Sequence, residues 1–353
     1  MRIFIHACHS NKHAITFPNY LIDFTIRIGH FMDKFSNVPI DLVYTWVDGS
    51  KFSHILGRTF RKFGQSLTSD NTWTRWADRG DLKYSLRSIA KNSNFFRRIF
   101  IVCADGQRPS WLRCDDRVEI IQHSTIIPAK YLPNYCSSAI ESFIHLIPGL
   151  SQQFVYSNDD FMFWAPVDQD FFLDGTRPKI YLDEEVISNE LPSNTDNGDE
   201  AGKKNGNIML NSRFGTSQRR NVYHFPVPLT KSACAKAWEG FPEQLDLAAQ
   251  VRFRSHSSVA FTNHLIPHLM LHEGSAVARS SQGLGMQLSY RNYRFTNLLA
   301  AVVRHKGEVP EVRAKKRLAV QPEPRFVNID GDEITILKIM ESRFAKSGPH
   351  END

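Results

Sequence analysis

The stretch that decides the fold is IDLVYTWVDG, from Ile40 to Gly49, a short β-rich run that ends in an Asp-Gly turn. β-Branched and aromatic residues bounded by turn residues predict a buried strand. A helical pattern follows over 80–92, where the apolar positions share one face, and a second apolar run follows over 98–102. Two strands separated by a helix make a βαβ unit, which predicts a parallel sheet.

The same alternation continues along the chain. A third strand is predicted over 118–121, a helix over 137–147 and a fourth strand over 153–157, which runs into Asn158-Asp159-Asp160. The sequence therefore predicts an α/β fold, a mostly parallel sheet flanked by helices. Open α/β sheets present their ligand-binding residues at the carboxyl ends of the strands, so we expect Asp48 and Asp159-Asp160 to lie at a functional edge.

The rest of the pattern divides the chain into further parts. Residues 188–207 are almost all turn-forming or charged, which predicts a long flexible loop. Helical periodicity returns over 231–248 and 256–271, and a strand-like run covers 326–331. We therefore expect five segments: an N-terminal extension (1–38), an α/β core (39–187), the loop (188–207), a partly helical remainder of the same domain (208–335) and a C-terminal tail (336–353).

Composition excludes several protein classes. The chain has 353 residues, 41% of them hydrophobic, and a net charge of +6, which rules out intrinsic disorder, collagen and small disulfide scaffolds. Its five cysteines form no C-x-x-C pair, so reduced thiols in a cytoplasmic protein are expected. No apolar run approaches the ~20 residues of a membrane-spanning helix. The charge is uneven, because residues 183–204 hold seven acids and only two lysines.

Asn158-Asp159-Asp160 is the most distinctive local feature. Oxygen-donor side chains at the end of an apolar strand suit a hard cation such as Mg²⁺ or Mn²⁺, although a turn with an Asx cap is the plain alternative. The aromatic residues of 154–156 and 161–164 favour the cation, because unpaired carboxylates are costly in apolar surroundings.

The first strand offers two more acids and an aromatic pair. Asp41 begins this strand, and Asp48-Gly49 follows it either as a binding loop or as an ordinary turn. Tyr44 and Trp46 supply a stacking face for a nucleobase or, as is more usual on a buried strand, belong to the core.

Candidate proton-transfer and phosphate-binding residues come later in the sequence. His224 lies in a segment that Pro226 and Pro228 keep from being helical, so its imidazole could act as a general base; most of the 14 histidines must nevertheless be structural or solvated. Arg252 and Arg254 alternate along an extended stretch, which suits either a clamp on phosphate oxygens or a solvated surface strand.

Taken in order, these pieces resemble the stealth family of bacterial capsular-polysaccharide hexose-1-phosphate transferases, which is related to the catalytic part of the lysosomal-enzyme GlcNAc-1-phosphotransferase. The resemblance covers about residues 40–270. It rests on the run 40–49, on ordered motifs between Arg75 and Asp160, on His224-Phe225-Pro226, and on Arg252-Phe253-Arg254-Ser255. Two departures stand out. Cys136 occupies a position where the family has Asn, and the family's final Ile-Asn-Asp triplet is matched only loosely by Val327-Asn328-Ile329-Asp330.

The resemblance implies a Rossmann-like or GT-A-like nucleotide-sugar-binding core and transfer of a sugar 1-phosphate from a UDP-sugar, for example UDP-GlcNAc, to a sugar hydroxyl, with release of UMP. Asp159 and Asp160 would hold Mg²⁺ or Mn²⁺, with Asn328 and Asp330 as further candidates. His224 would take the proton of the acceptor hydroxyl. Arg252 and Arg254 would stabilise the oxygens of the transferred phosphoryl group. Asp41 and Asp48 would line the donor site or orient His224.

The resemblance also implies substrate-contacting residues and partners. The contacting set is Trp46, Asp48, Gly49, Arg75, Arg87, Asp105, Gln107, Ser137, Glu141 and Asn158. The expected partners are the UDP-sugar donor and an oligo- or polysaccharide acceptor, not nucleic acid. The expected location is the cytoplasm, peripheral on the inner face of the plasma membrane and near the capsule export machinery.

Two other functions fit parts of the sequence. A metal-dependent glycosyltransferase also uses an acidic pair after a strand, but the attacked atom is the anomeric carbon and the product is UDP. A non-catalytic binder of anionic glycan or nucleic acid would use the basic segments 58–62 and 313–317 with interleaved aromatic residues. Release of UMP rather than UDP separates the first alternative from the phosphotransferase.

Overall fold

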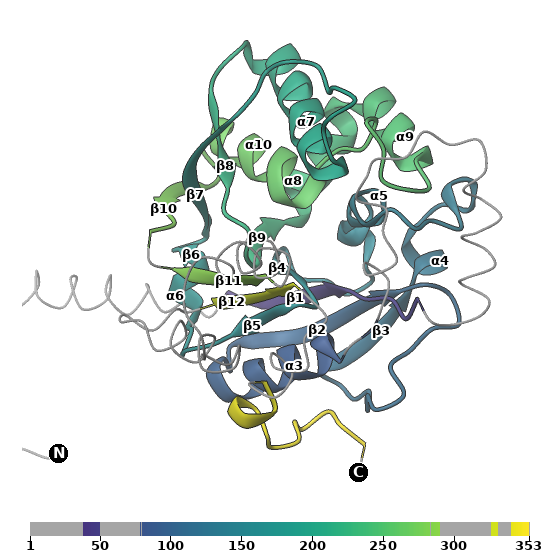
Figure 1. The fold of residues 1–353 in the computed structure, drawn as a ribbon, viewed down its shortest axis with the longest axis vertical. Helices are drawn as coiled ribbons and strands as arrows, with labels where there is room; N and C mark the ends of the chain where they lie inside the picture. The colour runs from purple at the N-terminus through teal and green to yellow at the C-terminus, as the bar shows by residue number, and fades with distance from the viewer. Residues whose placement is uncertain are drawn as a thin grey trace, which may run out of the picture. The chain divides into compact units, whose positions relative to one another are not determined.

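The computed structural model describes residues 38–49, 78, 80–282, 284–289, 326–330 and 340–352, with the backbone alone at 285–289 and 326–330. The chain falls into two units, Met1–Val38 and Pro39–Asp353, and the labelled helices and strands all belong to the second (Figure 1). The expected N-terminal extension, apart from Val38, and Arg75 lie outside the described residues.

A five-stranded sheet forms the centre of this unit, in the order β3-β2-β1-β4-β9. The first four strands are parallel and β9 is antiparallel to β4. This confirms the predicted mostly parallel α/β sheet. The strands are β1 (Ile40–Thr45), β2 (Phe96–Cys103), β3 (Val118–Gln122), β4 (Gln153–Asn158) and β9 (Val227–Thr230).

Helices cover both faces of the central sheet, which is why its strands are nearly continuous apolar runs. Helix α3 (Asp81–Asn92), which matches the helix expected over 80–92, lies on one face, and α7 (Gly198–Phe214), α8 (Lys231–Gly240) and α10 (Ile266–His272) lie on the other (Figure 1). Tyr44 points toward α3, where its hydroxyl lies 2.7 Å from Ser85 Oγ. Val43 belongs to the core beneath α7, α8 and α10.

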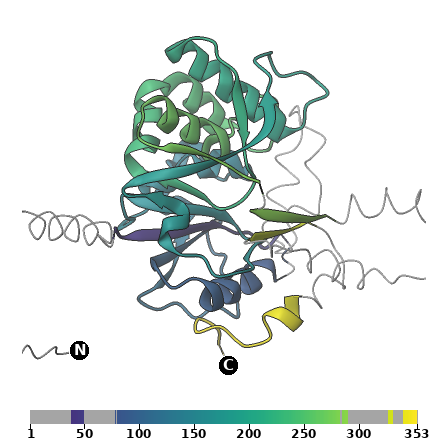
Figure 2. The same cartoon turned by 90° about the vertical axis from the view of Figure 1, so that its left-hand side faces the viewer.

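Two smaller sheets extend the structure. One has the order β10-β7-β6, with β8 also paired to β7; the other has the order β11-β12-β5 and lies beside the central sheet (Figure 2). The strand expected over 326–331 is confirmed as β12. The strands are β5 (Phe161–Phe163), β6 (Leu173–Asp174), β7 (Arg177–Ile187), β8 (Arg219–Val222), β10 (Val277–Ser280), β11 (Gly285–Ser289) and β12 (Phe326–Asp330).

The helix expected over 137–147 is interrupted. It is replaced by α5 (Ser137–Glu141) and the 3-10 turn η4 (Ile144–Leu146). The other short helical elements are α4 (His123–Ile126), η3 (Ala129–Tyr131), α6 (Gln169–Phe172), α9 (Pro242–Gln250) and the π-helix η5 (Phe261–Leu265).

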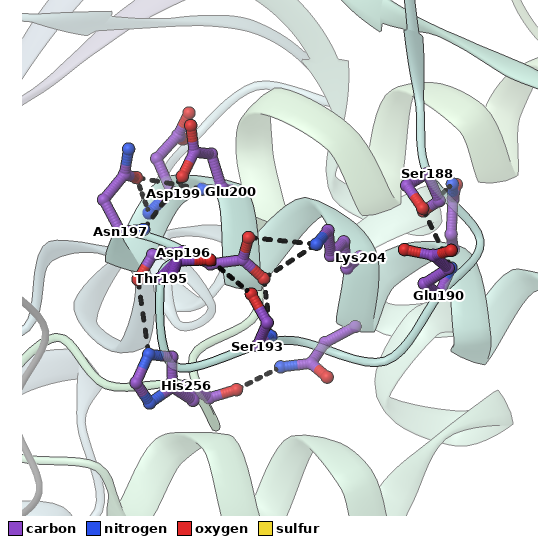
Figure 3. A network of polar contacts seen from close by, with 12 residues as sticks. Ser188, Glu190, Ser193, Thr195, Asp196, Asn197, Asp199, Glu200, Lys204 and His256 are labelled. Atoms are coloured by element: carbon purple, nitrogen blue, oxygen red, sulfur yellow. Dashed lines mark hydrogen bonds and ion pairs between the residues drawn. The ribbon is translucent and has the colours of Figure 1, made fainter.

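The prediction of a flexible loop over 188–207 is wrong from residue 198 onward, where α7 begins. Asn197 accepts hydrogen bonds from the backbone N–H groups of Asp199 and Glu200, and the Glu200 carboxylate accepts one from Asn197 N–H at 2.9 Å, which completes a capping box (Figure 3). This cap and the acidic first turn stabilise a helix start. The polar composition that suggested a loop is therefore the signature of a capped helix.

The tail expected over 336–353 is packed where the structure describes it. Residues 340–352, the C-terminal segment, lie against α3 (Figures 1 and 2). Met340 and Phe344 are buried, and Glu351 forms a bidentate ion pair with Arg87. In the described part of the chain, no helix combines the length and the hydropathy needed to span a bilayer.

Candidate functional site

The carboxyl ends of β1 and β4 meet at one edge of the central sheet. Thr45, the last residue of β1, is in register with Asn158, the last residue of β4, and Thr45 Oγ1 lies 2.9 Å from the Tyr156 hydroxyl. From β1 the chain continues to β2 on one side, whereas β4 lies on the other side. Open α/β sheets bind ligands at such a topological switch point. Asp48 follows β1 and Asp159-Asp160 follows β4, so these residues lie at this edge, as expected.

One side of this edge is strongly acidic. Asp159 follows β4, and burial raises its pKa well above the ordinary value, with Asp160, Asp81 and Asp78 adding negative charge. Asp81 is the first residue of α3. Carboxylates gathered in this way need positive charge to remain ionised.

This donor set fits Mg²⁺ or Mn²⁺, which prefer oxygen ligands. Within the described ranges, no group of three or more His, Cys, Asp or Glu side chains is arranged to hold a metal ion. Mg²⁺ sites commonly use one or two carboxylates and complete the coordination with water and substrate phosphate. Asp159 and Asp160 are therefore suited to a site that the substrate completes.

His224 stands beside these carboxylates. It lies in the connection from β8 to β9, its ring is exposed, and its Nε2 is 3.5 Å from Asn158 Nδ2. The imidazole also meets the Phe161 ring edge-on, with 4.9 Å between ring centroids. The structure thus brings together His224 and the acidic tripeptide, which are far apart in the sequence.

Arg254 occupies the basic side of the site, together with residues of α5. Its Nη2 donates to Ser137 Oγ at 2.9 Å. Burial raises the pKa of Glu141, while the hydrogen bond from Thr262 and the charge of Arg254 act in the opposite direction. Ser137, Glu141 and Arg254, all three expected from the sequence, form one cluster.

Asp199 is a site residue that the sequence analysis missed. Its Oδ2 lies 2.7 Å from Lys203 Nζ, and its Oδ1 accepts from Asn263 Nδ2 at 3.0 Å. Burial would raise the pKa of Asp199, but the positive charges of Lys203, Arg254 and His224 lower it below its ordinary value. The capping-box pattern from Asn197 to Glu200 was the available signal, because it predicts a helix that begins at this point.

The loop after β1 is held by Gln107. Asp48 N–H donates to Gln107 Oε1, and Gln107 Nε2 donates to the Asp48 carbonyl, both at 3.0 Å. Gln107 therefore fixes the backbone at Asp48, and Gly49 is buried in the same loop. Trp46 is only 4% exposed, so its ring belongs to the core and offers no open stacking face.

Asp41 does not reach the site, contrary to expectation. It lies at the amino end of β1, four residues before Thr45 and thus about 13 Å away along the strand. Its carboxylate accepts from Arg97 Nε at 2.9 Å, Arg97 Nη2 at 2.6 Å and Ser151 N–H at 2.6 Å. Because the strands are parallel, their first and last residues lie at opposite edges, and Asp41 stabilises the edge away from the site.

Three other expected residues have structural partners elsewhere. Arg87 pairs with Glu351 at 2.6 and 2.7 Å, and Asp105 accepts from Ser124 N–H and Oγ at the start of α4. The Arg252 guanidinium donates to the carbonyls of Pro133 and Lys130, at 2.7 and 3.0 Å. Arg252 and Arg254 thus contact different elements, and a joint clamp of the pair on phosphate stays a prediction.

Asn328 and Asp330 lie on β12, whose backbone pairs with β5 and β11. Asn328 is in register with Phe161, the residue after Asp160. The backbone therefore brings β12 next to the acidic tripeptide, and metal binding by Asn328 and Asp330 stays a prediction.

Comparison with known proteins adds independent information. Residues 75–180 match the model of stealth protein conserved region 2. Among solved structures, the galactosyltransferase LgtC in complex with donor and acceptor sugar analogues aligns with a TM-score of 0.42 at 10% identity, covering 89% of this chain and 97% of that one. Mouse xyloside xylosyltransferase 1 aligns with a TM-score of 0.37 at 11% identity, covering 82% of this chain and 97% of that one.

Several curated proteins are similar in sequence. An exopolysaccharide phosphotransferase of Streptomyces coelicolor is 35% identical over 243 residues, 68% of this chain and 41% of that protein. The capsular polysaccharide phosphotransferase SacB of Neisseria meningitidis serogroup A is 32% identical over 274 residues, which are 76% of this chain and 48% of that protein. The chain thus spans less than half the length of these two relatives. The capsular polysaccharide phosphotransferase cps1A of Actinobacillus pleuropneumoniae is 30% identical over 249 residues, 68% of this chain and 67% of that protein. With this identity over two thirds of both chains and the match to conserved region 2, the protein belongs to the stealth family.

Proposed function

We propose that the protein transfers hexose-1-phosphate, for example GlcNAc-1-phosphate, from a UDP-sugar to a hydroxyl of an oligo- or polysaccharide acceptor. The product is a phosphodiester-linked capsular or cell-surface polysaccharide, and UMP is released. The observation that carries the proposal is the 3.5 Å approach of His224 Nε2 to Asn158 Nδ2, which places an exposed imidazole beside the Asp159-Asp160 pair. A base next to a diphosphate-binding site is what attack by a hydroxyl on phosphorus requires.

In this reaction the acceptor oxygen attacks the phosphorus that carries the sugar. The bond from that phosphorus to the oxygen shared with the uridine-bearing phosphate breaks, and UMP leaves. His224 accepts the hydroxyl proton at Nε2. Arg254, held by Ser137, faces the equatorial oxygens, where charge must be stabilised.

The acidic side of the site supports metal binding by Asp159 and Asp160. Mg²⁺ or Mn²⁺ bound there would neutralise charge on the diphosphate and polarise its oxygens. The protein residues do the remaining work: Gln107 fixes the loop at Asp48, where the donor would lie, and Asp199 balances the positive charges of Arg254 and His224.

The same proposal includes a cytoplasmic location on the inner face of the plasma membrane, near the polysaccharide export machinery. Outside the acidic segment 183–204, the chain carries an excess of positive charge. Such an excess favours anionic lipid surfaces and polyanionic phosphodiester products.

Product analysis with UDP-GlcNAc, Mg²⁺ and a short oligosaccharide acceptor tests the proposal. We expect UMP and a phosphodiester-linked product; release of UDP would instead establish the glycosyltransferase alternative. Polymer binding that weakens with salt, without turnover of any UDP-sugar, would favour the non-catalytic binder.

The base role has its own test. His224→Ala should abolish transfer while UDP-sugar binding, measured calorimetrically, persists. His350→Ala is the matched control. His350 lies in the C-terminal segment, where its Nδ1 is 2.8 Å from Asp115 Oδ2. Undiminished turnover by His224→Ala would exclude the imidazole as the base.

A further inference from the structure

The backbone that follows Arg254 forms a closed turn. Ser258 N–H donates to the Ser255 carbonyl at 3.1 Å, and Ser255 N–H donates to Ser258 Oγ at 3.1 Å. These bonds fix the path of the chain directly after Arg254. The direction of the Arg254 side chain therefore depends on where this turn is anchored.

Asn205 of α7 is an anchor of this turn. Its Nδ2 donates to two carbonyls, those of His256 and Ser258, both at 2.8 Å. Two further contacts continue along the same side of α7: Ala260 N–H donates to the Gly202 carbonyl at 3.1 Å, and Asn263 Nδ2 donates to Asp199 at 3.0 Å. Positions 199, 202 and 205 are three residues apart and so share a helix face. This face of α7 binds residues 256–263.

The other end of Arg254 is held by α5, where its Nη2 donates to Ser137 Oγ at 2.9 Å. The arginine is thus fixed at its guanidinium by one helix and at its following backbone by another. We propose that Asn205 is a positioning residue for Arg254, acting through the 255–258 turn. This inference rests on the proposed function in one respect, because it takes Arg254 as the residue that meets the phosphoryl group.

Only an amide donor suits this place. Asn205→Asp keeps the size of the side chain but sets a carboxylate against two carbonyl oxygens, so the turn must move. A displacement of about 1 Å at a catalytic group can cost about 100-fold in rate. We therefore expect Asn205→Asp to lower kcat by about 10- to 100-fold with a smaller change in the KM for the acceptor.

Asn207 supplies a matched control on the same helix. Its Nδ2 also donates to two backbone carbonyls, those of Ile187 and Ser188, at 3.1 and 3.2 Å, but these lie at the end of β7. It is fully buried, and its Oδ1 lies 2.8 Å from His264 Nε2. Asn207→Asp should therefore lower the Tm more than Asn205→Asp does while leaving kcat close to that of the unmodified protein.

A double-mutant cycle with Arg254→Ala gives the decisive readout. If Asn205 acts through Arg254, then Asn205→Asp has no further effect on kcat in the Arg254→Ala protein. If the losses of kcat from Asn205→Asp and Arg254→Ala multiply in the double variant, the proposal is wrong. An equal loss of kcat in Asn205→Asp and Asn207→Asp would also overturn it. If Asn205→Asp does not fold, Asn205→Ala replaces it in the cycle, because it removes the donor without adding charge.

Calorimetric binding of UDP separates this inference from the proposed function. We expect UDP to bind the unmodified protein and to bind both Arg254→Ala and Asn205→Asp more weakly. Absence of UDP binding by the unmodified protein would count against the proposed function itself. Weakened binding in Arg254→Ala with unchanged binding in Asn205→Asp would refute the positioning role alone.

Discussion

Two arginines separated by a single residue make different contacts. The Arg252 guanidinium donates to the backbone carbonyls of Lys130 and Pro133, whereas the Arg254 guanidinium donates to Ser137 beside Glu141. Phe253, between them, is fully buried and stacks on Tyr135 with 5.1 Å between ring centroids. The first guanidinium therefore contacts loop carbonyls, whereas the second lies beside Ser137 and Glu141 of the candidate site.

Alanine substitutions should separate these roles. Arg254→Ala should lower kcat by about 100- to 1,000-fold, as expected for losing a group that stabilises transition-state charge, with little change in Tm. Arg252→Ala should instead lower the Tm by a few degrees, because its two hydrogen bonds to backbone carbonyls are lost. Steady-state kinetics and thermal unfolding on both variants test this, and equal kinetic losses would show that both arginines meet the substrate.

At this scale the sequence predicted residue types well and positions less well. Asp159, Asp160, His224 and Arg254 follow from motifs, and the structure brings them to one edge. Asp41 was misplaced because the role that the resemblance implied was given more weight than its position at the start of a strand, away from the carboxyl ends where open α/β sheets bind ligands. Asp199 was missed because the polar composition of 188–207 predicted a loop, and because its distant partners Arg254 and His224 approach it only in three dimensions.

Helix α7 is the element on which the basic side of the site is built. Its glycines allow close approach to the segment before α10: a Cβ on Gly202 would lie 2.8 Å from Ala260 N, and one on Gly206 would lie 2.8 Å from His264 Cδ2. Glycine within a helix is intrinsically unfavourable, so tertiary packing explains both positions.

Gly202→Ala should destabilise the fold despite its better helix propensity. The new methyl group meets backbone that cannot move freely, and overpacking of this kind costs about 1–3 kcal/mol. Ser212→Ala, on an exposed part of the same helix, is the control and should be neutral or slightly stabilising. Denaturant unfolding measures both free energies, and an unchanged or raised stability for Gly202→Ala would contradict the close packing.

Element prediction failed where composition and local chemistry disagreed. Residues 188–207 are polar enough for a loop, yet the Asn197 capping box begins a helix within them. Conversely, the apolar period over 137–147 is typical of a single helix, but Ser142 and Phe143 separate α5 from η4. The strand β7 was missed because its charged residues hide the alternation expected of a half-buried strand.

His145, His264 and His268 are buried in the interior of the molecule. Burial lowers the pKa of His145 and His268 to about 4 and that of His264 well below its ordinary value, with neighbouring positive charge adding to the effect. Each is therefore neutral in the folded protein over a pH range in which the unfolded chain is protonated.

Stability should consequently fall as the solution is acidified. Between pH ~6.5 and ~4 these three histidines bind more protons in the unfolded state than in the folded state, so their contribution to the free energy of unfolding decreases with falling pH. His268 alone would contribute a loss of about 3 kcal/mol at the acid end. Urea unfolding at pH 7 and pH 5 measures the slope. His268→Gln, which can still donate to the Arg220 carbonyl, should flatten it, and an identical slope in that variant would exclude His268 as a cause.

Glu351, in the C-terminal segment, also contributes stability that is lost on acidification, but at lower pH. Burial would raise the pKa of Glu351, but Arg87, the Gly348 N–H and Lys83 lower it to about 2. Its contribution is complete above the ordinary carboxyl pKa and is lost as the pH falls through about 2. Glu351→Gln should therefore increase hydrogen exchange in residues 340–352 at neutral pH. Unchanged exchange would show that Met340 and Phe344 hold the segment without the ion pair.

The contact between Arg87 and Glu351 joins residues that are synthesised at different times. The two residues are 264 positions apart, and at synthesis rates of about 5–20 residues per second roughly 13–53 s separate their appearance. During that interval α3, which carries Asp81 at the edge of the acidic cluster, lacks the partner that covers its outer face. The C-terminal segment can therefore pack onto α3 only after the strands and helices that precede it have been synthesised.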